Sequence, residues 1–75
     1  MTEKGISLPL LRKRRQQAGL SQEELAARAG VGVSTIIRIE RGAHARYETL
    51  GKLAKALHLE RKQLLQDDPP KEAAA

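Results

Sequence analysis

The segment from residue 22 to residue 41 constrains the fold of this chain most, because it reads as two short helices joined by a tight turn. Leu25 and the alanines around it give the first helix a small apolar face. Gly30 follows, where helices often end in the left-handed conformation that glycine adopts without steric penalty. Ile36 and Ile39 recur at helical spacing and can pack back onto the first helix. The segment therefore predicts a tightly packed helix pair.

Helix signals of the same kind extend over most of the chain. Ser21 and Glu24 form the pattern of a capping box at the start of the first helix of the pair. No segment shows the alternation of a strand, so we expect an all-α, compact five-helix domain. The expected helices cover residues 8–18 (capped by Ser7), 22–29, 33–41, 47–57 and 60–65. The expected domain covers residues 7–66, between a flexible lead at 1–6 and a flexible tail at 67–75.

The basic charge lies in the part of the chain that is expected to fold. Residues 8–66 hold twelve Lys or Arg against five Glu, whereas the ends hold two Lys and four acidic residues. A basic domain suits a polyanionic partner, either a nucleic acid or an anionic membrane, although the charge alone can equally keep the surface solvated. Tyr47 is the only aromatic residue, so the chain has no stacking platform for single-stranded nucleic acid.

Composition excludes several other functions. The chain has no cysteine, which rules out disulfides, thiolate metal sites and thiol nucleophiles. Its apolar runs are shorter than the roughly 18 residues of a membrane span, and its first residues lack the apolar stretch of a signal peptide. His44 and His58 fall at expected helix boundaries, away from any cluster of catalytic or metal-binding groups. We expect a cytoplasmic protein that is not an enzyme and uses no metal or cofactor.

A helix pair joined by a glycine-containing turn is the helix-turn-helix unit, whose second helix enters the DNA major groove. Over residues 8–66 the chain resembles the phage repressor and Cro family of such proteins, of the xenobiotic-response-element type. The matching motifs are Leu20-Ser21-Gln22-Glu23-Glu24-Leu25-Ala26, Ala29-Gly30-Val31, Ser34-Thr35-Ile36, Arg38-Ile39-Glu40-Arg41-Gly42, and Thr49-Leu50 through Leu53-Ala54-Lys55-Ala56-Leu57. The resemblance implies five helices, operator DNA and usually a dimer. Gly32 and Ile37 depart from it, because the family often has a Ser or Thr cap and a polar residue there.

The outward face of the second helix of the pair is the expected base-reading surface. Arg38 can pair in bidentate fashion with guanine, whereas Ser34 discriminates weakly between bases. Val33 and Ile37 can pack against thymine methyls, and Ile37 can equally serve core or dimer packing. The resemblance places Val33, Ser34 and Arg38 on base-contact positions. We therefore expect base contacts from Val33, Ser34, Ile37 and Arg38.

Residues on either side of that face are expected to contact DNA phosphates: Gln22, Thr35, Arg41, His44 and Arg46. Gln22 opens the first helix of the pair, where free amides and partial positive charge suit a phosphate. The resemblance also implies a phosphate contact there, and a solvated surface glutamine is the alternative. Ser34 and Thr35 can instead serve the amides of the helix start.

Arg15 and Glu40 each lie on an otherwise apolar stripe, so each must find a partner or stay in water. We expect them to form an ion pair that ties the first helix to the third, as the resemblance also implies. The alternative is two independent side chains that reach solvent. Arg14 is expected to reach solvent.

These features predict a sequence-specific, duplex DNA-binding transcription regulator. It is expected to act as a homodimer on a two-fold symmetric operator, with no membrane partner. Apolar surface around Leu59, Leu64 and Leu65 can form the dimer contact or close the monomer core. The alternative function is a protein-interaction module on the same fold, similar to a coactivator.

Overall fold

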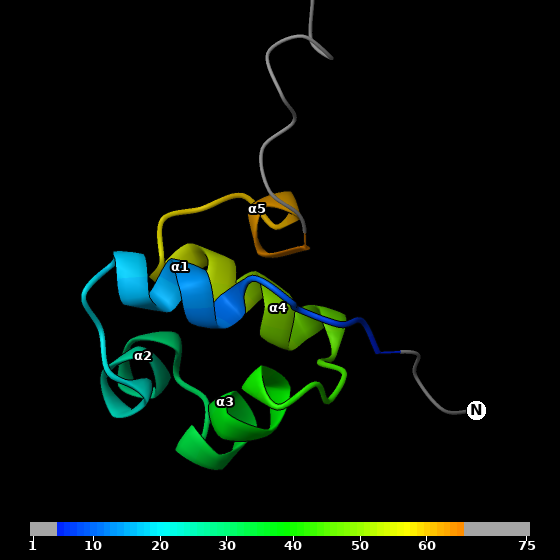
Figure 1. Cartoon of the computed structure of the whole chain (residues 1–75), viewed down its shortest axis with the longest axis horizontal. Helices are drawn as coiled ribbons and strands as arrows, with labels where there is room; N and C mark the ends of the chain where they lie inside the picture. The colour runs from blue at the N-terminus through cyan, green and yellow to red at the C-terminus, as the bar shows by residue number, and fades with distance from the viewer. Residues whose placement is uncertain (1–4, 66–75) are drawn as a thin grey trace, which may run out of the picture.

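Five helices follow one another through residues 5–65, the part of the chain that the computed structural model describes (Figure 1). They are α1 (Leu11–Gln17), α2 (Gln22–Ala29), α3 (Val33–Glu40), α4 (Tyr47–Ala56) and α5 (Lys62–Leu65). Helix α2 packs against α3 and α4, and α1 packs against α3 and α5. Helix α3 lies at the lower edge of the molecule in Figure 1, and α5 lies above α1 and α4. The predicted all-α fold of five helices is confirmed for these residues.

Helix α1 begins later than predicted, so the expected cap at Ser7 is wrong. Leu10 occupies the N-cap position, and no side chain caps this end of the helix. The preceding backbone bonds to distant parts of the chain instead, because the Ile6 amide donates to Ala45 O (2.8 Å) and the Leu10 amide to Leu64 O (3.2 Å). Leu8 is buried in this non-helical segment. Tertiary contacts have replaced the first helical turn that the local pattern predicted.

The C-terminal helices also differ slightly from the predicted bounds. Helix α4 ends at Ala56, and Leu57 caps it, one residue earlier than expected. His58 then adopts a left-handed conformation with φ of 58°, which turns the chain toward α5. Helix α5 begins at Lys62 rather than at residue 60. Glu60 lies before it, where its amide donates to the Gln63 side chain (2.8 Å).

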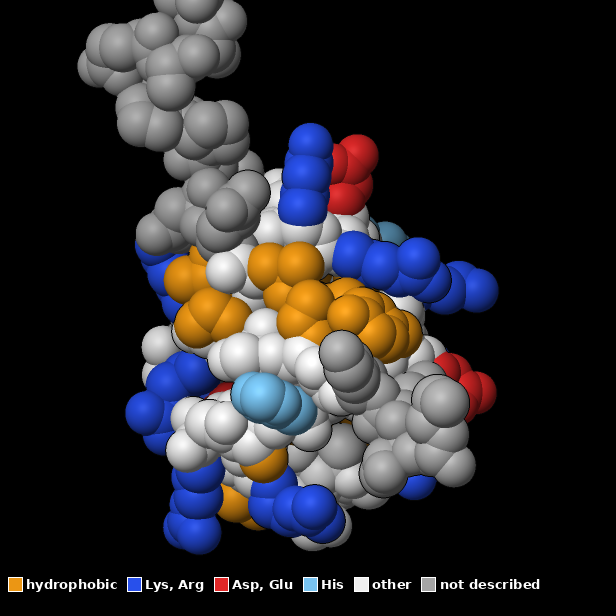
Figure 2. Space-filling model, turned by 90° about the vertical axis from the view of Figure 1, so that its right-hand side faces the viewer, with side chains coloured by type: hydrophobic (Ala, Val, Ile, Leu, Met, Phe, Trp, Pro, Cys, Tyr) orange, Lys and Arg blue, Asp and Glu red, His pale blue; other side chains and the backbone are white. Residues whose placement is uncertain are grey.

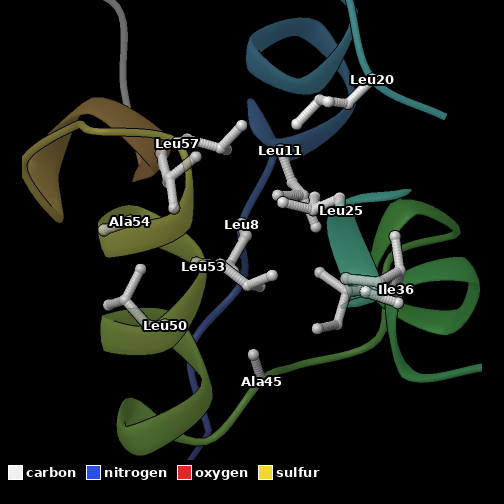
Figure 3. Close-up of a cluster of buried hydrophobic side chains, with 13 residues drawn as sticks. Leu8, Leu11, Leu20, Leu25, Ile36, Ala45, Leu50, Leu53, Ala54 and Leu57 are labelled. Carbon is white, nitrogen blue, oxygen red and sulfur yellow. The ribbon is translucent and has the colours of Figure 1, made fainter. Parts of the chain in front are cut away.

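The core takes side chains from every helix and from the segments between them (Figure 3). The buried hydrophobic residues are Leu8, Leu11, Leu20, Leu25, Ala26, Ile36, Ile39, Ala45, Leu50, Leu53, Ala54, Leu57 and Leu64. Leu64 is completely buried, so it closes the monomer core, whereas Leu59 and Leu65 are half-buried against it. The core therefore fixes the isoleucine face of α3 inward.

The N-terminal boundary of the fold lies earlier than the predicted lead suggests. Ile6, the last residue of that lead, forms an antiparallel bridge with Ala45 and packs partly against the core. Residues 1–4 of the lead, and the tail predicted over residues 67–75, lie outside the described residues.

Candidate nucleic-acid interface

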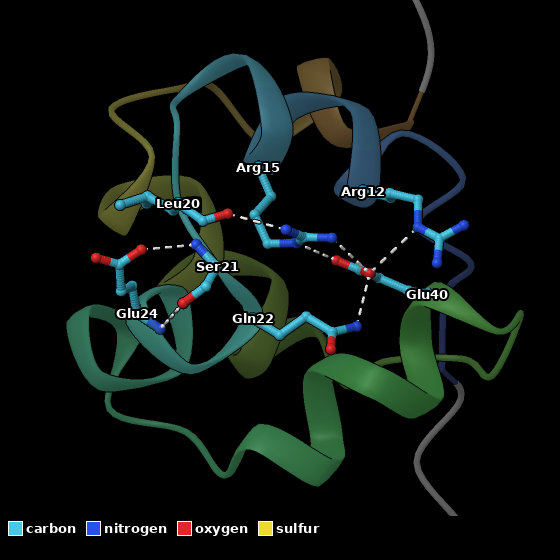
Figure 4. Close-up of polar contacts among 7 residues, drawn as sticks. All are labelled: Arg12, Arg15, Leu20, Ser21, Gln22, Glu24 and Glu40. Carbon is cyan, nitrogen blue, oxygen red and sulfur yellow. Dashed lines mark hydrogen bonds and ion pairs between the residues drawn. The ribbon is translucent and has the colours of Figure 1, made fainter.

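The start of α2 is fixed by its own side chains (Figure 4). The Ser21 hydroxyl accepts from the Glu24 amide (3.0 Å), and the Glu24 carboxylate accepts from the Ser21 amide (2.8 Å). These two bonds satisfy amides that a helix start leaves open. The pKa of Glu24 is lowered, chiefly because the Ser21 amide donates to its carboxylate. At the other end, Gly30 is left-handed with φ of 72° and turns the chain into α3.

Helix α3 has an inner and an outer face. Ile36 and Ile39 are buried in the core, as the spacing predicted. Ser34, Arg38 and Arg41 are exposed on the polar flank, whereas the remaining residues expected on this surface are half-buried, namely Val33, Thr35 and Ile37. Val33 also packs partly against the core. The polar flank of α3 is therefore open to a partner.

Glu40, at the C-terminal end of α3, accepts hydrogen bonds from α1 and α2 at once (Figure 4). Arg15 Nε and Nη2 donate to its two oxygens at 2.7 and 3.1 Å, and Arg15 Nη1 donates to Leu20 O at 2.8 Å. Gln22 Nε2 donates to Glu40 Oε1 at 3.0 Å. Arg12 Nε lies 3.6 Å from the same oxygen and is itself exposed. The expected Arg15–Glu40 pair is thus part of a larger cluster.

The charges in this cluster stabilise each other despite burial. Burial by itself raises the pKa of Glu40, but hydrogen bonds from Arg15 and Gln22, with the charges of Arg15 and Arg12, lower it overall. The hydrogen bond to Glu40 raises the pKa of Arg15 against the opposing effect of burial. Both groups are therefore charged in the folded protein at neutral pH. The cluster fixes the position of α3 relative to α1 and α2.

The structure gives Gln22 a partner that the sequence did not predict. Its amide group is half-buried and donates to Glu40, so it is not the freely solvated glutamine of the alternative. In Figure 4 its nitrogen points to the Glu40 carboxylate and its side-chain oxygen points away from it. Arg12 was also missed as a neighbour of Glu40, although its place three residues before Arg15 puts both on one side of α1.

A shallow hollow of about 310 Å³ lies between α3 and the start of α4. Its lining brings together four of the expected site residues, namely Thr35, Arg38, His44 and Arg46. Thr49 lines it too and was not singled out from the sequence. In Figure 2, Lys and Arg side chains project from the lower end of the molecule, where Figure 1 places α3. Ser34 and Arg41 lie outside this hollow.

Arg14 was expected to reach solvent and does so only in part, with Nη1 donating to Gln17 Oε1 at the surface (3.3 Å). It is half-buried, and its Nε donates to Gln63 O at 2.9 Å, which ties α1 to α5. No helix within residues 5–65 is long and apolar enough to cross a membrane. Among the same residues, no three His, Asp or Glu side chains are grouped so that they could hold a metal ion.

Two packed helices are joined by a tight turn, and the second has an exposed polar flank with arginine side chains around it. These features define the class of proteins that bind DNA through a helix-turn-helix unit. The helix-turn-helix family model matches residues 11–64. The chain belongs to this family.

Relatives support the same assignment. An uncharacterized HTH-type transcriptional regulator of Methanothermobacter thermautotrophicus is 41% identical over 66 residues, which cover 83% of this chain and 96% of the relative. A solved structure, the SinR protein/SinI protein complex, superposes with a TM-score of 0.72 at 27% identity. That match covers 91% of this chain and 66% of the other. Family, fold and relative agree on a DNA-binding transcription regulator, and the protein-interaction alternative is not favoured.

Proposed function

We propose that this regulator reads duplex DNA by placing α3 in the major groove. Arg38 would pair with a guanine and Ser34 would contact a neighbouring base edge. Val33 and Ile37 would lie against thymine methyl groups. The observation that carries the proposal is the exposure of Ser34 and Arg38 on a helix whose opposite face buries Ile36 and Ile39 in the core.

Phosphate contacts would hold α3 in the groove from both sides. Gln22 would contact one strand from the start of α2, where the helix end favours an anion. Thr35, Arg41, His44 and Arg46 would contact the phosphates on the other side. Three of these residues line the hollow beside α3, which supports a shared role for them. Such contacts position the protein and make its affinity depend on salt.

We also propose a homodimer on a two-fold symmetric operator, in the cytoplasm. Two recognition helices about 34 Å apart would read half-sites about 10 bp apart. The half-buried side chains of Leu59 and Leu65 could take part in the dimer contact, whereas the fully buried Leu64 belongs to the monomer core.

The experiment that tests this function is selection of binding sites from random duplexes at two salt concentrations. The proposal predicts one enriched motif with two-fold symmetry, and weaker binding at the higher salt concentration. An enriched motif without two-fold symmetry would contradict the homodimer, but it would still agree with base recognition by α3. Equal, weak binding of all duplexes would contradict sequence-specific recognition.

A further inference from the structure

The chain before α1 runs beside the loop between α3 and α4 (Figure 1). The Ile6 amide donates to Ala45 O and the Ala45 amide donates to Ile6 O, both at 2.8 Å. This two-bond bridge joins residues that are far apart in the sequence. It lies next to the hollow that is lined by the proposed phosphate-contacting residues.

The bridge is formed at Ala45, which lies between His44 and Arg46, two of the proposed phosphate-contacting residues. All three residues line the hollow, but Ala45 is 4% exposed and belongs to the core, whereas His44 and Arg46 are exposed. Successive side chains of an extended backbone point to opposite sides. Fixing Ala45 inward therefore directs the side chains of His44 and Arg46 outward, toward the flank of α3.

The other backbone bonds of this loop lie at its two ends. The Ala43 amide donates to Arg38 O (2.9 Å) at the end of α3, and the Leu50 amide donates to Arg46 O (2.9 Å) in the first turn of α4. Between these anchors, both backbone bonds formed by Ala45 go to Ile6. The N-terminal segment therefore supports the middle of the loop, together with the burial of Ala45 in the core.

Gly5 lets this segment approach the loop closely. A Cβ atom placed on Gly5 would lie 2.7 Å from His44 Cβ and 3.1 Å from Ala45 O. The first distance is shorter than two carbon atoms tolerate, and both contacts involve atoms close to the backbone. Any side chain at residue 5 must push the segment and the loop apart, and His44 is the first residue displaced.

We propose that Gly5 and Ile6 form a positioning strap that holds the α3–α4 loop in its DNA-binding conformation without touching DNA. The inference rests on the proposed function, because the strap matters for binding only if the loop contacts phosphates. The strap then contributes to the affinity and salt dependence of binding through His44 and Arg46. Within the fold, it supports the loop and leaves the helix pair itself unchanged.

Two substitutions weaken the strap in different ways. Gly5→Val introduces the steric clash, and Ile6→Pro removes the amide that donates to Ala45 O. Ser7→Val is the matched control, since it adds the same β-branched side chain two residues later at an exposed position. We expect both strap variants to bind the selected duplex about tenfold more weakly, as for loss of one charge-assisted contact. The slope of log affinity against log salt should fall by about one. The control should bind like the native protein.

A double variant is used to distinguish a positioning role of Gly5 and Ile6 from a general loss of protein stability. His44→Ala and Arg46→Ala are combined to make a chain whose loop has lost its proposed phosphate contacts, and Gly5→Val is added to it. We expect Gly5→Val to cost about tenfold in the native background and to have almost no effect in the double variant. Urea unfolding of every variant shows that each is folded under the binding conditions.

The outcomes are distinguishable. An equal loss from Gly5→Val in both backgrounds, or no loss in the native one, would overturn the strap and leave the proposed function standing. Native affinity in the double variant would overturn the phosphate contacts of the loop, and the strap with them. Absence of any preferred duplex for the native protein would instead show that the proposed function has failed.

Discussion

At the C-terminal end of α3, the Glu40 side chain is 1% exposed and receives hydrogen bonds from two other helices. At the N-terminal end, Gly32 is the cap residue, no side chain bonds to the free amides, and Ser34 is exposed. One end is fixed to the core by charge and side-chain hydrogen bonds. The other, open end has no side-chain cap and is held by packing and by backbone bonds, such as the one from the Thr35 amide to Gly32 O (3.0 Å). The two ends of this one helix are therefore held in different ways. Glu40 fixes the C-terminal, anchored end of the helix, and the flank that carries Ser34 and Arg38 stays exposed along its length.

The largest expected effect comes from breaking the anchored end. Arg15→Ala leaves Glu40 buried without its main partner, which should cost about 3–5 kcal/mol in the free energy of unfolding. Arg12→Ala is the matched control, because Arg12 is 65% exposed and 3.6 Å from the same carboxylate. The control should cost only about 0–1 kcal/mol. Urea unfolding measures both, and equal losses would show that the cluster is not an anchor.

Arg38→Ala tests the exposed flank of α3, in the last turn of the helix. We expect a loss of about 1–3 kcal/mol in binding free energy and a relaxed preference at one base pair, because one bidentate contact with guanine is removed. Stability should change little, since Arg38 is exposed. Repeating the site selection with the variant measures the preference. A uniform loss over all duplexes would mean that Arg38 contacts the DNA backbone instead.

Acid should weaken the anchored end of α3. The pKa of Glu40 is lowered in the folded protein, so the pair contributes stability that is fully present above the ordinary value of 4.5. This contribution is lost as the pH falls through the lowered pKa, because the unfolded chain takes up the proton more readily. Glu40→Gln should therefore unfold with a weaker pH dependence in this range. An unchanged pH dependence would contradict the role of Glu40.

The smallest expected effect comes from strengthening the open end. Gly32→Ser supplies a side-chain cap to α3, and a Cβ at this position meets only ordinary contacts, the nearest at 3.8 Å. We expect a gain of a few tenths of a kcal/mol in stability. Thermal or urea unfolding detects it. A loss would mean that the backbone at Gly32 requires glycine for a reason beyond capping.

Local sequence signals were sufficient to predict the α2–α3 helix pair. The features that the sequence did not predict depend on long-range contacts. The capping box at Ser21, the glycine end at Gly30 and the buried isoleucines all depend on neighbours a few residues away, so the sequence predicts them well. Ser7 offered an equally local cap, but backbone bonds to Ala45 and Leu64 displaced it.

For the candidate site, too, the sequence predicted the features that depend on local pattern and missed the long-range contacts. The open flank of α3 follows from periodicity, whereas the Gln22–Glu40 bond joins residues 18 positions apart and Arg14 bonds to a carbonyl 49 positions away. No pattern in the sequence encodes those pairs, because they depend on how the helices meet. The base and phosphate contacts themselves remain predictions, since they depend on the DNA.

The most direct test of the account is to follow backbone amide chemical shifts while the protein is titrated with its selected duplex. We predict that the largest changes fall on residues 33–38 of α3, on Gln22 and on the loop at residues 43–46. Helix α5 and the buried face of α1 should change little. Large changes confined to α5 and the end of α4, with α3 unaffected, would contradict the assignment of α3 as the DNA-reading helix.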